Sequence, residues 1–288
     1  CIRDSFHSEY SITDGIVRID PMIHAVLEGG GAAVGISDLM NVFGGLRFYT
    51  HALAAGLKPI LGCDLKVINP KDLNKPFRLG VLCMNHEGYH SLSVLLTKAF
   101  LTNNDAARGL VDPKWFDDGG SEGLIALSGA AQGELGSLLL GKKWALAHEA
   151  AERFKAQFPG RFYVELQRAG RPTDELATAR LANFAVEEQL PVVATHPIQF
   201  LKPEDFEAHE VRCSIAEGYT LQDPRRVKRY TPEQYLKSEA EMCELFADIP
   251  AAIENTVEIA KRCNLDGVLS KPQLPLFPTP DGMSLDDY

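Results

Sequence analysis

The chain has 288 residues, of which 45% are hydrophobic and 24% are charged, and its formal net charge is −10. This composition is typical of a globular domain, and the length suits a single α/β barrel. The acidic balance argues against a surface that grips nucleic acid, because neutralising phosphates requires a basic face, so we expect little direct DNA binding. The longest apolar runs, such as residues 92–96, are too short to cross a bilayer, and no membrane partner is expected.

The cysteines and the ends of the chain bear on the compartment. Six cysteines at positions 1, 63, 83, 213, 243 and 263 include no CxxC pair, which disfavours a disulfide framework or a zinc knuckle. The first residues lack the basic and apolar regions of a signal peptide. We therefore expect a cytoplasmic location. The densest basic run, residues 225–229, either contacts a phosphate or forms a solvated loop between helices.

Apolar segments typical of buried strands alternate with helical patterns along most of the chain. Strands are expected at residues 1–6, 33–38, 58–64, 77–83, 124–128, 161–166 and 191–196. Helices are expected at 20–27, 46–55, 86–101, 135–158 (as one or two), 174–189, 203–217, 232–246 and 250–263, and a proline opens each of the last three. This order predicts an α/β fold of about seven βα units, with a mostly parallel sheet closed or nearly closed into a barrel that the last helices buttress.

Two segments fall outside this alternation. Residues 102–122 are polar and rich in turn-forming residues, and we expect an insertion with a short helix near Trp115. Residues 271–280 contain too many prolines for a helix or a central strand. The predicted organisation is therefore one domain over residues 1–270 and a proline-rich linker over 271–288, leading to a further region.

Side chains that can bind metals follow most of the expected strands. The C-terminal ends of barrel strands meet at one rim, where such folds place catalytic groups. Imidazoles and carboxylates at such a rim can bind zinc or manganese. The same residue types also serve as helix N-caps and loop hydrogen-bond acceptors, and the spacing alone leaves both interpretations open. The residues concerned are His7, Asp14, Asp38, Asp64, Glu165 and His196.

Several motifs together identify a family. They are HSEYSITDG at residues 7–15, ISD at 36–38, GLKPILGCD at 56–64 and CELFADIP at 243–250, with further matches at 85–89 and 255–263. These motifs resemble the PHP (polymerase and histidinol phosphatase) domain at the N-terminus of bacterial DNA polymerase III alpha subunits, and the resemblance spans essentially the whole chain. It implies a distorted seven-stranded (βα)7 barrel, TIM-like, with extra C-terminal helices, and a phosphoester-hydrolysing trinuclear metal cluster.

Most metal-ligand positions of that family are changed here. The resemblance places ligands at His7, Asp14 and at Asp64, which replaces a glutamate. At the remaining positions the family's ligands are replaced by Ser5, Leu39, Arg78, Ala130, Pro197 and Gln199. Arg78 puts a fixed positive charge where a cation is held, and we expect its guanidinium to pair with Asp14 or Asp64. His196 lies next to a lost ligand, and a single weakly bound zinc or manganese ion, held by His7, Asp14, Asp64 and His196, is the alternative.

The resemblance therefore implies a metal-site-degenerate domain with no cofactor and no catalytic residue. It would stabilise the alpha subunit and dock the separate proofreading exonuclease subunit, with the polymerase region of its own chain as the other partner. The parent would be a DNA-directed DNA polymerase, a nucleotidyltransferase, whose polymerase site lies beyond residue 288. The alternative is a metal-dependent phosphoesterase, either a pyrophosphatase or a 3′-5′ exonuclease, with a reduced metal site.

Overall fold

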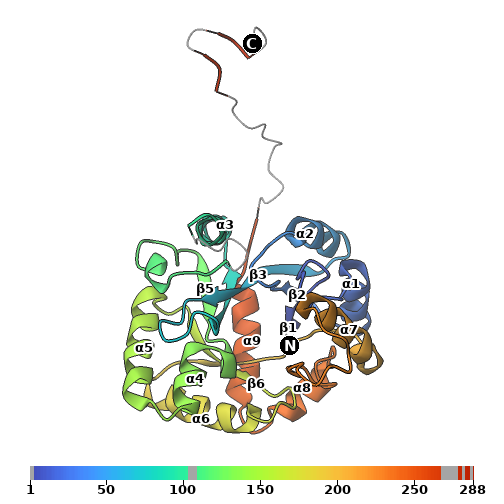
Figure 1. Cartoon of the computed structure of the whole chain (residues 1–288), viewed down its shortest axis with the longest axis vertical. Coiled ribbons are helices and arrows are strands. Elements are labelled where there is room, and N and C mark those ends of the chain that lie inside the picture. Colours follow the sequence, from blue (N-terminus) through green and yellow to red (C-terminus); the bar gives the residue numbers. More distant parts are fainter. Residues whose placement is uncertain (1–2, 103–108, 267–277, 281–282, 286–287) are drawn as a thin grey trace.

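Strands β1 to β7 form a curled sheet that most of the helices surround (Figure 1). The computed structural model describes residues 3–102, 109–266, 278–280, 283–285 and 288. The strands are β1 (Arg3–Phe6), β2 (Ala33–Ile36), β3 (Lys58–Val67), β4 (Phe77–Cys83), β5 (Leu124–Leu127), β6 (Phe162–Gln167) and β7 (Val192–Thr195).

Nine α-helices lie within the described ranges. They are α1 (Ile19–Glu28), α2 (Gly45–Ala54), α3 (His86–Leu101), α4 (Glu134–Leu140), α5 (Trp144–Gln157), α6 (Asp174–Glu187), α7 (Phe206–Glu217), α8 (Glu239–Leu245) and α9 (Pro250–Arg262). Short 3₁₀ turns cover Pro113–Phe116, Ala130–Gln132 and Pro203–Asp205. The predicted α/β class, the short helix near Trp115 and the extra C-terminal helices are confirmed.

The strands are neighbours in chain order, and β4 is the exception to the parallel arrangement. The pairs β1–β2, β2–β3, β5–β6 and β6–β7 are parallel, whereas β4 runs antiparallel to both β3 and β5. The prediction of regular βα units was wrong between β3 and β4, because residues 68–76 join them without a helix, and such a short connection requires an antiparallel pair. The start of β4 therefore lies at the same edge of the sheet as the end of β3.

Two expected segments differ from the structure. Asp64 does not end its strand: antiparallel pairing with β4 extends β3 to Val67. The predicted helix at 232–246 was wrong in its first half. There the backbone pairs with the segment after β7, through Gln199 N–H to Gln234 O and Leu236 N–H to Phe200 O. The helix, α8, begins only after Ser238, whose side chain and that of Glu241 form a capping box.

Helix α9 packs on the inner face of the curled sheet, while the other helices lie outside it (Figure 1). Side chains alternate between the two faces of a strand. On β3 and β7, Ile60 and Val193 form a buried cluster with Ile259 and Cys263 of α9 and its C-cap, whereas Leu61 and Ala194 join the outer core under the surrounding helices. Ile60 and Asp64 share a face, so the inner face is apolar beside α9 and becomes polar further along the strands.

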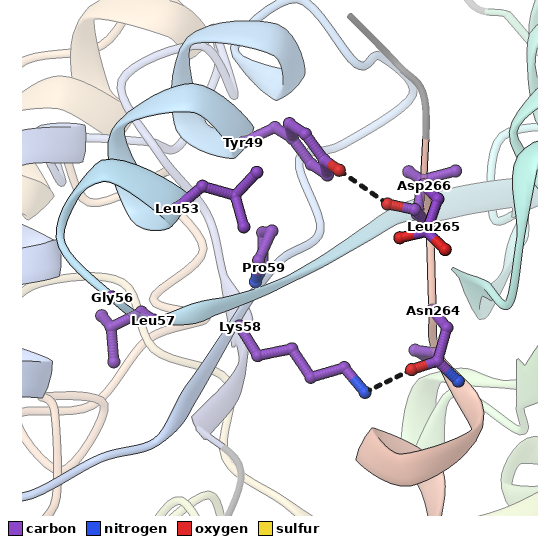
Figure 2. A pocket seen from close by; sticks show the side chains of 10 residues that line it. Tyr49, Leu53, Gly56, Leu57, Lys58, Pro59, Asn264, Leu265 and Asp266 are labelled. Carbon is purple, nitrogen blue, oxygen red and sulfur yellow. Dashed lines mark hydrogen bonds between the residues drawn. The ribbon is translucent and has the colours of Figure 1, made fainter.

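A pocket of about 340 Å³ opens where the chain leaves α9, between the start of β3 and residues 263–266 (Figure 2). Two polar side chains that line it are paired: Tyr49 Oη donates to Leu265 O at 2.8 Å, and Lys58 Nζ donates to Asn264 Oδ1 at 2.7 Å. Lys58 Nζ also donates to Ala260 O at 2.7 Å, which satisfies a carbonyl in the last turn of α9. These hydrogen bonds fix the segment that follows α9 to α2 and to the start of β3.

None of the helices in the described part of the chain has the length and apolar character needed to cross a bilayer. The predicted boundary at residue 270 lies outside the described residues, and so does most of the predicted linker over 271–288. Both stay predictions. The predicted insertion at 102–122 likewise includes residues 103–108, which are outside the described part.

Candidate functional site

A cluster of charged side chains occupies the polar end of the inner face of the sheet. Asp64 and Lys66 project on the same face of β3 because they are two residues apart. The antiparallel register sets Lys66 directly opposite Arg78 and Asp64 opposite Gly80. His7 follows β1, next to Phe6 on the outer side. The fold therefore brings together residues that are far apart in the sequence.

The imidazole of His7 lies between two carboxylates. Its Nδ1 is 3.0 Å from Asp14 Oδ2, and its Nε2 is 3.1 Å from Asp64 Oδ2. His7 and Asp14 are 4% and 3% exposed, so the pair is shielded from water. Burial alone would lower the pKa of His7, but the charges and hydrogen bonds of Asp14 and Asp64 outweigh it and raise that pKa to about 10. The ring is therefore an imidazolium that donates from both nitrogens at neutral pH.

The two carboxylates are held in their charged forms. Burial raises the pKa of each, but His7 and Arg78 reverse this effect and hold the pKa of Asp14 and that of Asp64 below their usual range. Arg78 Nη1 lies 3.6 Å from Asp64 Oδ2, as the sequence predicted for one of the two aspartates. Burial and the nearby guanidinium of Arg78 lower the pKa of Lys66.

The loop at residues 8–15 positions Asp14. Ser11 Oγ donates to Asp14 Oδ1 at 2.6 Å, and the N–H of Gly15 donates to Ser11 O at 2.6 Å. A side chain at position 15 would not fit, because its Cβ would lie 1.6 Å from Ser8 O. The glycine of the Asp-Gly pair in the opening motif is therefore required by the tight turn that directs Asp14 at His7.

Sequence reasoning missed three residues of this neighbourhood. Tyr230 Oη donates to Asp14 Oδ2 at 3.2 Å, and His209 Nε2 lies 2.9 Å from Asp14 O. Both come from segments beyond β7, about two hundred positions from Asp14 in the chain, and nothing local in their sequence marks them. Lys66 is different: it lies two residues beyond Asp64, where the predicted strand ended, and it shares a face with Asp64 because pairing with β4 extends β3 to Val67.

The other three candidates from the strand ends lie in separate networks. Asp38 accepts hydrogen bonds from Ser8 N–H at 2.6 Å and from Ser8 Oγ at 2.8 Å. It therefore serves as a loop hydrogen-bond acceptor, one of the two roles that the sequence left open. Glu165 accepts from Gly129 N–H at 2.9 Å and from the hydroxyl of Thr195. His196 Nε2 lies 2.9 Å from Glu233 O, and burial lowers its pKa to about 4. None of the described contacts joins these residues to His7.

The residues that the resemblance predicted to replace metal ligands make other contacts in the structure. Leu39 donates its backbone N–H to Ser11 Oγ at 3.1 Å, and Pro197 O accepts from Gln234 Nε2 at 3.1 Å. Gln199 Oε1 lies 3.2 Å from His209 Nε2. Ala130 is buried with φ of 45°, a conformation that an L-residue rarely adopts. Ser5 belongs to β1.

The basic run at 225–229 is largely neutralised within the chain. Arg225 pairs with Asp223, Arg226 with Glu210 and Arg229 with Glu217, at 2.7, 2.5 and 2.8 Å. This pairing favours the interpretation as a loop fastened to α7 over a phosphate-gripping surface.

Residues 5–169, more than half of the chain, match the model of the PHP domain. The chain belongs to the PHP domain family. Its relatives in this family include the DNA polymerase III subunit alpha of Neisseria meningitidis serogroup B (strain MC58), which is 49% identical over 98% of this chain and 25% of its own length. The same subunit of Escherichia coli K12 is 43% identical over 98% of this chain and 24% of its own length.

This PHP domain chain thus spans about a quarter of the length of the curated relatives it matches. A solved structure of an amidohydrolase from Chromobacterium violaceum aligns with 69% of the chain and 87% of its own, at 12% identity and a TM-score of 0.46.

Proposed function

We propose that the chain is the N-terminal PHP domain of a replicative DNA polymerase III alpha subunit, where it is a structural and docking domain without metal chemistry of its own. Relatives named DNA polymerase III subunit alpha, 42–49% identical over 98% of the chain, support the first part. In this proposal the strands close into the family's distorted seven-stranded barrel. The parallel bridge from Phe6 at the end of β1 to Ile198 beyond β7 supports that closure.

The observation that carries the second part is the pairing of both ring nitrogens of His7 with carboxylates. A histidine binds a metal through the lone pair of a neutral ring, so a metal would have to displace the proton that Asp14 and Asp64 hold on His7, next to the fixed positive charge of Arg78. The family's metal cluster therefore does not fit these residues: His7 already supplies the cation that Asp14 and Asp64 require, and Arg78 supplies a second. Among the residues described, no group of three or more His, Cys, Asp or Glu is arranged to hold a metal ion.

Without metal chemistry, the domain would serve to stabilise the polypeptide and to bind partner proteins. We propose as partners the polymerase region of the same polypeptide and the separate proofreading exonuclease subunit, in the cytoplasm. The curated relatives are about four times as long as the chain, which supports the first partner. The resemblance of the motifs to PHP domains of the degenerate type supports the second.

Metal analysis tests the chemistry. The chain would be incubated with zinc or manganese, freed of excess metal and analysed for bound metal and for turnover of a generic phosphodiester. We expect neither stoichiometric metal nor turnover, and the same result for His7→Ala. One metal per chain, with turnover that is lost in His7→Ala and retained in the exposed-site control His90→Ala, would establish the phosphoesterase alternative instead.

Titration calorimetry tests the docking. The 288-residue chain and the proofreading exonuclease subunit of the same organism are mixed in the presence of EDTA, and we expect a one-to-one complex at micromolar concentration. Absence of a complex under these conditions would overturn the docking role and leave the metal result untouched, so the two parts of the proposal fail separately.

A further inference from the structure

Two cations lie on neighbouring strands at the rim of the charged cluster, and one carboxylate, that of Asp64, forms an ion pair with one of them, Arg78. Lys66 on β3 and Arg78 on β4 are direct cross-strand partners, and both are only partly buried. We propose that they form a binding site for a small phosphate-type oxyanion. This proposal is independent of the docking role above.

The hydrogen-bonding groups of this pair are incompletely used. Arg78 Nη1 is shielded from solvent and has no hydrogen-bond partner among the described residues, since its approach to Asp64 is 3.6 Å. The Lys66 ammonium has no hydrogen bond or ion pair within the described ranges, whereas the backbone of Lys66 is engaged: its N–H donates to Met40 Sδ, and its carbonyl accepts from Val111 N–H. A buried donor without an acceptor is uncommon in proteins and indicates an unseen water or ion.

The register makes the arrangement costly unless something offsets it. Like charges directly opposite each other on an antiparallel pair destabilise it. The nearby carboxylates offset this only in part, because Asp14 and Asp64 both contact the imidazolium of His7. The side chain of Arg78 keeps 21% of its surface exposed, compared with 6% for His7, and Lys66 is also only partly buried. Nη1 itself is shielded, so an anion would approach from solvent along the exposed parts of these two side chains.

The chemistry of the pair selects the ligand. A guanidinium presents a planar fork of donors, and an ammonium is a compact charge with three donors. A tetrahedral dianion has enough acceptor oxygens to accept from both at once, whereas chloride has no directional acceptors for the fork. The shared chemistry is a phosphate group, supplied either as free inorganic phosphate or within a nucleic-acid backbone. The double charge favours the free anion.

The test measures inorganic phosphate binding by calorimetry and by the shift in the melting temperature of the 288-residue chain. EDTA is present, and potassium chloride of equal ionic strength is the reference. We expect saturable binding to the wild type, weakened about tenfold or more by Lys66→Met, because one charge-assisted contact is lost. Lys66→Arg should retain binding. Lys71→Met is the matched control, since Lys71 is an exposed lysine in the nearby connection between β3 and β4, and this variant should bind phosphate as the wild type does.

Three results would overturn the proposal: no phosphate effect beyond that of chloride, equal binding by Lys66→Met and the wild type, or equal loss in Lys71→Met. A short single-stranded oligonucleotide without terminal phosphates is the second arm. If it binds through Lys66 and inorganic phosphate does not, the assignment to a free anion is wrong.

Discussion

His7 Nε2 and Asp64 Oδ2 lie 3.1 Å apart, and this contact joins the residue after β1 to the second half of β3. Because the sheet places β2 between β1 and β3, the contact reaches over a neighbouring strand. With Asp14 on the other ring nitrogen, His7 occupies the centre of the cluster. The following predictions concern this cluster and the contacts that hold the segments around it.

Replacing His7 with alanine should destabilise the chain by about 3–5 kcal/mol, because removing one partner of a buried ion pair leaves uncompensated charge. Asp14 would lose its closest cation. The free energy of unfolding, measured by urea denaturation, checks this. His90→Ala, at an exposed position of α3, should change it by less than about 0.5 kcal/mol. Equal stability of His7→Ala and the wild type would contradict the description of the cluster as ion-paired.

Stability should depend on pH through the same ring. The pKa of His7 is raised from 6.5 to about 10, so the folded state binds this proton more tightly than the unfolded state does. This contribution is complete below pH 6.5 and is lost as the pH rises through about 10. Unfolding measured across this window should show wild-type stability falling towards that of His7→Ala. A constant difference between the two proteins would show that the ring does not titrate in this way.

The buried and exposed pairs of the basic run should differ in their contribution to stability. The Arg226 and Glu210 side chains are 4% and 8% exposed, whereas Arg225 is 74% exposed and pairs with Asp223. Arg226→Met should cost about 3 kcal/mol or more, and Arg225→Met less than about 1 kcal/mol. Thermal unfolding of the two variants, which remove the same chemical group, measures this contrast. Equal losses would mean that burial is not what distinguishes the two pairs.

Lys58→Met should loosen the end of α9. It removes the donor to Ala260 O and Asn264 Oδ1 while keeping the apolar stem, at a cost of about 1–3 kcal/mol. Amide hydrogen exchange should accelerate in the last turn of α9 and remain unchanged in α3. Lys261→Met provides the control, because Lys261 is 67% exposed and pairs with Glu258 on the surface. Unaltered exchange in Lys58→Met would show that the helix end is held by packing alone.

The order of strands and helices could be predicted because each has a strong periodic pattern. The direction of β4 could not, since a strand has the same apolar pattern in either direction and only the length of the connection at 68–76 distinguishes the two. The prediction that a helix begins at Pro232 was wrong for a similar reason. Proline suits a first helical turn, but pairing of Leu236 with Phe200 takes precedence there, and that contact is not visible in local sequence.

Part of the cluster was predictable for a different reason. The resemblance predicted that His7, Asp14, Asp64 and Arg78 share one site and that Arg78 pairs with Asp14 or Asp64. In the structure its ion pair is with Asp64. Tyr230 and His209 could not be found, because they reach Asp14 through long-range folding of the segments after β7. Asp38 and Glu165 show the converse: acids near strand ends that accept loop and hydroxyl hydrogen bonds instead of joining the cluster.

Strand β3 fastens the exit of α9 at one end, through Lys58, and carries Asp64 towards the other. A close-packed strand transmits displacement along its length because it compresses very little. Tension on the chain at Asp266 would therefore load the contact of Leu265 with Tyr49 and then that of Asn264 with Lys58, at the start of β3. In a longer polypeptide, the strand that anchors this exit would be the same strand that holds Asp64 beside His7.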